Sequence, residues 1–99
     1  MILYNVTINV DESIKDEWLE WMKNKHIPDV LATGLFIENK IFKIRTEGED
    51  GNTYSIQYFL RSDEDYERYQ NEFAPMLQAE HTDKFKDKFV AFRTVMELC

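Results

Sequence analysis

Few residues of this chain stand out as candidates for catalysis or ligand binding, and the first is His26. It follows a stripe of apolar residues at helical spacing (Ile14, Trp18, Trp21 and Met22) and stands directly before Ile27-Pro28. Because proline disfavours helical geometry in the residue before it, this step predicts the end of a helix. An imidazole titrates near neutral pH, so His26 is a candidate general acid or base in a pocket walled by Trp18, Trp21 or Met22. The favoured alternative is a structural one, in which the ring caps the helix C-terminus.

The remaining polar candidates are His81, Tyr58 and Arg93. His81 lies on a helical stripe between Leu77 and Phe85, where a histidine is most often a boundary residue of the core. The hydroxyl of a strand tyrosine such as Tyr58 needs a partner when it is buried. Arg93, within a strand, must either pair with a carboxylate or bind an anion, and pairing is the favoured interpretation. We therefore expect His26 as the catalytic candidate, and Trp18, Trp21, Tyr58, His81 and Arg93 as candidate ligand contacts.

The sequence lacks the motifs of several large functional classes. It has no nucleophile elbow, glycine-rich phosphate loop or zinc-protease motif, and Glu80 points away from its neighbour His81 on a helix. Cys99 is the single cysteine, so we expect no intramolecular disulfide and no multi-cysteine metal site. We also expect no other metal site and no cofactor. A net charge of −7 with no basic stripe argues against nucleic acid. No signal peptide or membrane span is predicted, which makes the cytoplasm the expected location.

The pattern of elements predicts one domain over residues 1–99. Four segments alternate or are rich in β-formers, at residues 2–10, 35–46, 53–61 and 89–98. A first helix is expected from a capping box at Ser13 and Asp16 to about Lys25, followed by a short turn from Pro28 to Gly34. A second begins after Ser62, and Pro75 is expected to kink or restart it near Ala74. Residues 47–52 predict a hairpin turn around Asp50-Gly51.

This β-α-β-β-α-β order predicts a ferredoxin-like α+β sandwich with a four-stranded antiparallel sheet. Right-handed crossovers place both helices on one face of the sheet. The bare face is expected to carry Leu3, Phe59 and Val95, together with Asn5, Gln57 and Arg93. Since apolar surface needs a cover and most soluble oligomers are symmetric, we expect a homodimer through this face.

Several motifs resemble a small bacterial family of unknown function, domain-of-unknown-function family 4286. They are Met1–Val10, Trp18-x-x-Trp21-Met22 through His26-Ile-Pro28, Ala32-Thr-Gly34-Leu-Phe36, Gln57-Tyr58, Ala74-Pro75, Ala79-Glu-His81 and Phe89-Val-Ala-Phe-Arg93-Thr. The resemblance covers nearly the whole chain and implies a dimeric α+β barrel built on a ferredoxin-like protomer. It implies no activity. Relatives by fold include antibiotic-biosynthesis-type monooxygenases and small isomerases, which is an analogy of fold alone.

Two functions of different classes remain open. One is a non-enzymatic dimeric module that binds a small molecule or a protein. The other is a cofactor-independent enzyme, isomerase or monooxygenase-like, acting on a small aromatic or anionic molecule with His26 as acid or base. A pocket discriminates between them: the enzyme requires His26 to face a cavity of roughly a few hundred Å³ with a second polar group nearby, whereas a His26 ring that bonds only backbone and faces solvent favours the module. A pocket, if one exists, is expected between the first helix and the sheet near His26, with Tyr58 or His81 as the second polar group.

Overall fold

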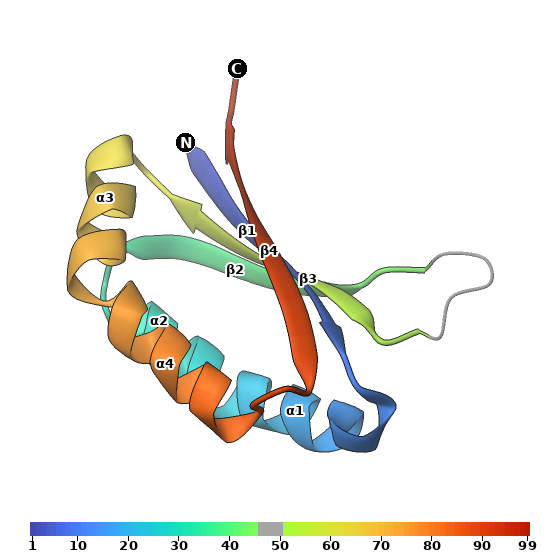
Figure 1. The fold of residues 1–99 in the computed structure, drawn as a ribbon. Helices are drawn as coiled ribbons and strands as arrows, with labels where there is room; N and C mark the ends of the chain where they lie inside the picture. Colours follow the sequence, from blue (N-terminus) through green and yellow to red (C-terminus); the bar gives the residue numbers. More distant parts are fainter. Residues whose placement is uncertain (46–50) are drawn as a thin grey trace.

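A computed structural model describes residues 1–45 and 51–99 of the chain. Its strands are β1 (Ile2–Val10), β2 (Phe36–Lys43), β3 (Thr53–Leu60) and β4 (Phe89–Glu97). They form one sheet in the order β2-β3-β1-β4, and every neighbouring pair is antiparallel. All helices lie on one face of this sheet (Figure 1). The predicted ferredoxin-like fold is therefore confirmed, with strand boundaries within three residues of those expected.

The first helical region is continuous, which corrects the predicted break at His26. A 3₁₀ turn (Glu12–Ile14) leads into α1 (Lys15–Trp21), a π-helical turn (Met22–His26) and α2 (Ile27–Leu31). Ile27 keeps helical backbone angles although Pro28 follows it, and its N–H bonds the carbonyl of Met22, five residues back. A π turn widens the helix, which relieves the clash that a proline ring otherwise causes inside an α-helix.

The start of this region also differs from the prediction. The residue that caps it is Asp11, whose carboxylate accepts hydrogen bonds from the backbone N–H and the hydroxyl of Ser13. Ser13 is therefore the donor in this interaction, and the expected capping box with Asp16 does not form. A carboxylate suits this position because it offsets the positive end of the helix dipole.

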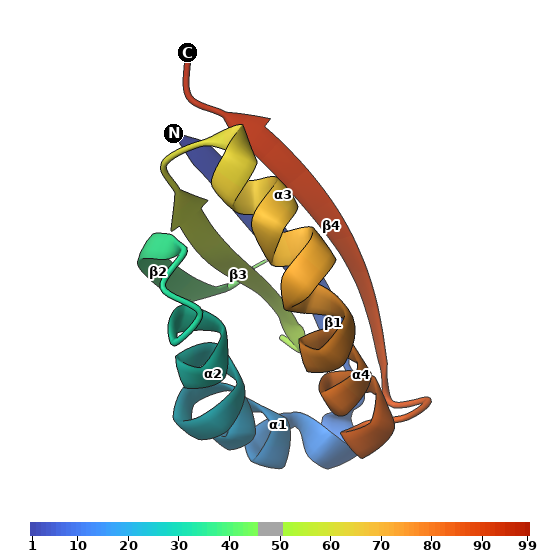
Figure 2. The same cartoon turned by 90° about the vertical axis from the view of Figure 1, so that its left-hand side faces the viewer.

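The second helical region matches the prediction closely. Ser62 caps α3 (Asp63–Glu72) by accepting a hydrogen bond from the backbone N–H of Asp65. The helix breaks at Phe73, and α4 (Ala74–Lys84) restarts with Pro75 in its first turn, where a missing N–H costs nothing. Figure 2 shows α3 and α4 in front of the sheet, with α4 nearer to β4 and α2 nearer to β2.

The register of β4 corrects the predicted composition of the bare face. Arg93 pairs with Val6 and Val95 pairs with Tyr4, so both side chains lie on the face that the helices cover. Apolar residues occur at both odd and even positions along β4. Alternation alone therefore did not decide which of its side chains face the helices. The bare face instead carries a larger apolar set from all four strands. Its members are Leu3, Phe42, Phe59, Val90, Phe92 and Met96.

The core fills the space between helices and sheet. Trp18 and Val30 from the first helical region and Leu60 from β3 have no exposed surface. The predicted hairpin turn falls largely on residues 46–50, outside the described part of the chain; Gly51 at its end has a φ of +79°, which favours glycine. Within residues 1–45 and 51–99, no helix has the length and apolarity needed to cross a bilayer.

Candidate functional site

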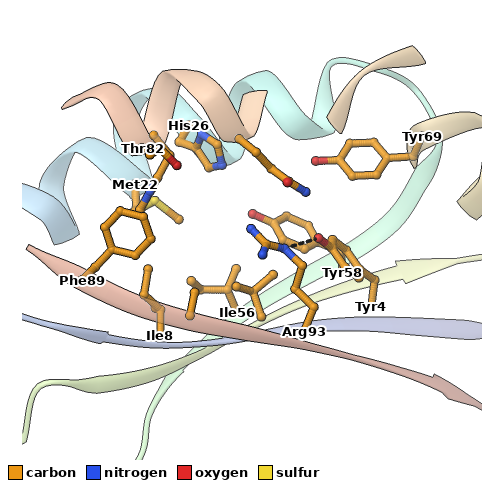
Figure 3. Close-up of a pocket in the computed structure, with 14 residues that line it drawn as sticks. Tyr4, Ile8, Met22, His26, Ile56, Tyr58, Tyr69, Thr82, Phe89 and Arg93 are labelled. Carbon is orange, nitrogen blue, oxygen red and sulfur yellow. Dashed lines mark hydrogen bonds between the residues drawn. The ribbon is translucent and has the colours of Figure 1, made fainter. Parts of the chain in front are cut away.

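A cavity lies between the helical layer and the sheet, beside the π turn (Figure 3). Its volume is about 50 Å³, enough for several water molecules. Among its lining residues, Thr82 of α4 and Arg93 of β4 are exposed, so the cavity meets solvent between these two elements. The lining consists of Tyr4, Val6, Ile8, Met22, His26, Ile56, Tyr58, Tyr69, Gln78, His81, Thr82, Phe89, Ala91 and Arg93.

Both tryptophans lie behind the cavity wall and do not line it. The indole N–H of Trp18, which is completely buried, donates a hydrogen bond of 2.9 Å to Nε2 of His81. Trp21 stacks on the ring of His26 with a centroid distance of 5.1 Å and an interplanar angle of 25°. The predicted tryptophan wall is therefore corrected to a second layer that holds the two histidines in place.

His81 is held as a neutral imidazole with its proton on Nδ1. Its Nε2 accepts from Trp18 and so carries no hydrogen. Burial lowers the pKa of His81 to about 4, with the nearby His26 and the positive charge of Arg93 adding to the effect. The ring also packs edge-on against Phe89, with centroids 4.4 Å apart. His81 therefore offers a hydrogen-bond donor and has no free lone pair at neutral pH.

His26 is buried against the cavity and does not cap a helix, which corrects the favoured structural interpretation. It makes no side-chain capping bond, and helical backbone continues on both sides of it. Its Nδ1 is shielded from solvent and has no hydrogen-bond partner among the described residues. Burial lowers its pKa, although the carboxylates of Glu80 and Asp29 act in the opposite direction. A buried nitrogen without a partner is costly, and such atoms mark sites where a ligand or water is expected.

The opposite end of the cavity is formed by tyrosines and an arginine. The Nε of Arg93 donates a hydrogen bond of 3.0 Å to the hydroxyl of Tyr4. The hydroxyls of Tyr58 and Tyr69 turn toward the middle of the cavity in Figure 3 and bond no group among the described residues. Burial raises the pKa of both tyrosines, so both hydroxyls keep their protons and can donate.

The structure brings four predicted site residues around this one cavity, namely His26, Tyr58, His81 and Arg93. Met22, expected as a possible wall of the pocket, also lines it. Sequence reasoning missed Tyr4, Tyr69 and Gln78 as site residues. Tyr4 has the same strand parity as Ile2 and Val6, and Tyr69 lies on an apolar helical stripe, so both resemble ordinary core residues. Their convergence depends on sheet register, which alternation does not reveal.

Metal-ligating side chains do not gather in the described part of the chain. No three histidine, cysteine, aspartate or glutamate side chains come together there in a way that would hold an ion. The two histidines face each other edge-on at a centroid distance of 5.7 Å, with no third ligand beside them. Cys99 is exposed and is not among the residues that line the cavity.

Comparison with family models gives one full-length match. The chain belongs to the family described as a domain of unknown function (DUF4286), whose model matches residues 1–99. A comparison with curated proteins finds no match.

Solved structures share the fold at low sequence identity. A dimeric ferredoxin-like protein from an uncultured marine organism has a TM-score of 0.69 and 15% identity, with 99% of this chain and 97% of that chain covered. HapK from Hahella chejuensis has a TM-score of 0.74 and 10% identity, with 100% and 93% covered. SnoaB from Streptomyces nogalater, a cofactor-independent oxygenase, has a TM-score of 0.71 and 9% identity, with 98% and 92% covered. At these identities the likeness extends to the fold alone.

Proposed function

We propose that the protein is a homodimeric binding module whose protomers each hold a small molecule in the cavity beside His26. The observation that carries this proposal is the pairing of apolar walls with polar groups that lack protein partners. Ile8 and Ile56 supply apolar surface, whereas His26 Nδ1 and the hydroxyls of Tyr58 and Tyr69 are unpartnered among the described residues. A few converging polar groups in an apolar pocket are typical of ligand sites.

The experiment is a titration of the protein with benzoate, benzamide and benzyl alcohol, monitored through the backbone amide signals in NMR spectra. We expect saturable shifts confined to residues around the cavity. Ala91→Phe, which places a ring in the cavity, should abolish them. Ala79→Phe makes the same change on the exposed side of α4 and should leave them intact. If none of the probes binds, or if both variants behave alike, the binding proposal fails.

A second candidate function is cofactor-independent acid–base catalysis, and one observation favours it. His26 is neutral at neutral pH because burial lowers its pKa, and its Nδ1 is not engaged by the protein. A neutral imidazole has one ring nitrogen with a free lone pair, and a histidine that lines a cavity is able to accept a proton there from a bound substrate. The cavity volume of about 50 Å³ is below the roughly 300 Å³ or more of common small-molecule sites, so any ligand or substrate that it holds is small. Proton–deuterium exchange into a bound carbonyl compound, lost in His26→Phe, would establish catalysis.

The homodimer is supported by the apolar surface of the bare sheet face. Phe92 and Val90 of β4 are 63% and 70% exposed, and Phe42 of β2 is 50% exposed. Polar side chains on the same face form hydrogen bonds with one another within the sheet. The Ser55 hydroxyl, for example, donates a hydrogen bond of 2.6 Å to the side-chain oxygen of Asn5. Apolar groups exposed on this scale mark an interaction surface. A solved protein of the same fold is described as dimeric, which adds support. The single cysteine suits the reducing cytosol to which we assign this dimer.

Sedimentation velocity at micromolar concentration tests the dimer. We expect the protein to sediment with twice the mass of one chain, and Phe92→Glu to give a monomer because it buries a charge in the interface. Met76→Glu is the matched control, since Met76 is 68% exposed on α4, away from the bare face. A monomeric wild type would overturn the assignment.

A further inference from the structure

The charges around the cavity differ from those of the rest of the molecule. The chain has a net charge of −7, with 19 acidic residues against 12 basic ones. Among residues 1–45 and 51–99, no aspartate or glutamate lines the cavity, and Arg93 is the only residue with a full charge that does. In the described part of this acidic protein, the entrance to the cavity therefore carries a cation and no carboxylate. Such an arrangement favours a ligand of negative charge.

Arg93 is available to such a ligand. Within residues 1–45 and 51–99 it pairs with no carboxylate, and its one hydrogen bond uses Nε, which donates to Tyr4. Some other cations of the protein are engaged in ion pairs: Lys25 pairs with Asp29 and Glu80, and Arg68 pairs with Glu72. The donors on the two terminal nitrogens of Arg93 therefore remain free. A guanidinium edge of this kind matches the two oxygens of a carboxylate.

The other polar groups of the cavity also offer protons. The hydroxyls of Tyr58 and Tyr69 keep their protons because burial raises the pKa of each. The Tyr4 hydroxyl accepts from Arg93 and keeps its own proton to donate. His81 carries its hydrogen on Nδ1. Donors thus predominate, and the complementary ligand group is one that accepts several hydrogen bonds, as a carboxylate does.

The walls define the rest of the ligand. The rings of Tyr4, Tyr58, Tyr69, Phe89, His26 and His81 make up much of the lining, and aliphatic side chains such as Ile8 and Ile56 supply most of the remainder. Flat aromatic surfaces of this density favour a planar ring, which they contact through face and edge. The small volume restricts the ring system to a single ring.

Resting on the binding function proposed above, we infer that the ligand is a monocyclic aromatic carboxylate. Its carboxylate lies against Arg93 and the hydroxyls of Tyr4 and Tyr58, at the end of the cavity that Figure 3 shows opposite Met22 and Phe89. Its ring extends toward His26. This arrangement requires the negative charge of the carboxylate, but it does not require a further hydrogen-bond acceptor on the ring.

The test compares benzoate with benzamide, which has nearly the same shape and no charge, by titration of the full chain. We expect benzoate to bind at least about tenfold more tightly, the factor that one charge-assisted hydrogen bond supplies. Arg93→Gln should remove this preference, because it weakens the binding of benzoate more than that of uncharged benzamide. Arg68→Gln removes the same charge from the exposed surface of α3 and should preserve the preference.

The outcomes separate the ligand class from the binding function. If benzamide binds as well as benzoate, or if Arg93→Gln retains the preference, the carboxylate inference is overturned while the cavity remains a binding site. If Ala91→Phe has no effect on either probe, or neither probe binds, both proposals fall. A preference for benzoate that is lost only in Arg93→Gln and in Ala91→Phe would support both.

Discussion

Trp18 and His81 are 63 residues apart in sequence, yet the indole N–H of the one donates to Nε2 of the other at 2.9 Å. Trp18 is completely buried and His81 is 8% exposed, so this bond is shielded from water. It joins α1 to α4 beneath the cavity and fixes which nitrogen of His81 carries the proton. Trp18 thus sets the tautomer of His81, a residue that lines the cavity, although Trp18 itself does not line it.

Trp18→Phe should therefore change both stability and the state of His81. It removes the donor and leaves Nε2 unpaired, which we expect to cost about 1–3 kcal/mol of unfolding free energy, measured by urea denaturation. Long-range ¹H–¹⁵N spectra should show the Nδ1–H tautomer in the wild type and a mixture in the variant. Trp21→Phe is the control because Trp21 makes no hydrogen bond to His81. A wild-type Nε2–H tautomer would contradict the observed bond.

The lowered pKa of His81 predicts a loss of stability in mild acid. In the unfolded chain the imidazole has its ordinary pKa of 6.5, whereas burial lowers it to about 4 in the folded protein. Between these values the unfolded state binds the proton more tightly, so the unfolding free energy decreases as the pH falls from about 6.5 toward 4. The total change from this group is at most about 3 kcal/mol.

His81→Gln isolates this contribution. The amide oxygen can still accept from Trp18, but the side chain no longer titrates. Urea denaturation at several pH values from 7 to 4 should therefore give a flatter profile than the wild type. Since the chain has only two histidines, a double variant with His26→Phe should flatten it further. Parallel profiles for wild type and His81→Gln would show that carboxylates, and not His81, govern the acid response.

The sequence was informative about the elements because their patterns are local. Alternation along 2–10 and 53–60 depends only on which residues are apolar, and the Ser62 cap and the Pro75 break depend on single residue types. The π turn had no such signal. A π turn adds one residue to a helical turn, and the apolar residues around it keep nearly helical spacing, so the sequence does not reveal it. Pro28 was therefore interpreted as ending the helix, which in fact continues past it.

The candidate site was predictable in part for the same reason. His26 and His81 stand out by residue type, and a cavity was expected between the first helix and the sheet. The position of Arg93 was not predictable, because both faces of β4 carry apolar residues and only its pairing with Val6 places the side chain under the helices. The tryptophans were assigned to the wall since size alone does not distinguish a residue that lines a cavity from one that supports it.

His26→Phe should separate the role of the His26 ring from that of its nitrogen atoms. Phenylalanine preserves the stack on Trp21 and removes Nδ1, which is buried without a partner among the described residues. We therefore expect unchanged unfolding free energy or a gain of up to about 1 kcal/mol, because an unsatisfied buried polar atom is eliminated. His26→Ala empties the same space and should lose about 2 kcal/mol or more, as other large-to-small core substitutions do. If His26→Phe is as stable as the wild type but fails to bind the aromatic probes, the nitrogen serves the ligand. If it destabilises the protein as much as His26→Ala does, the imidazole is a structural residue and has no role in the site.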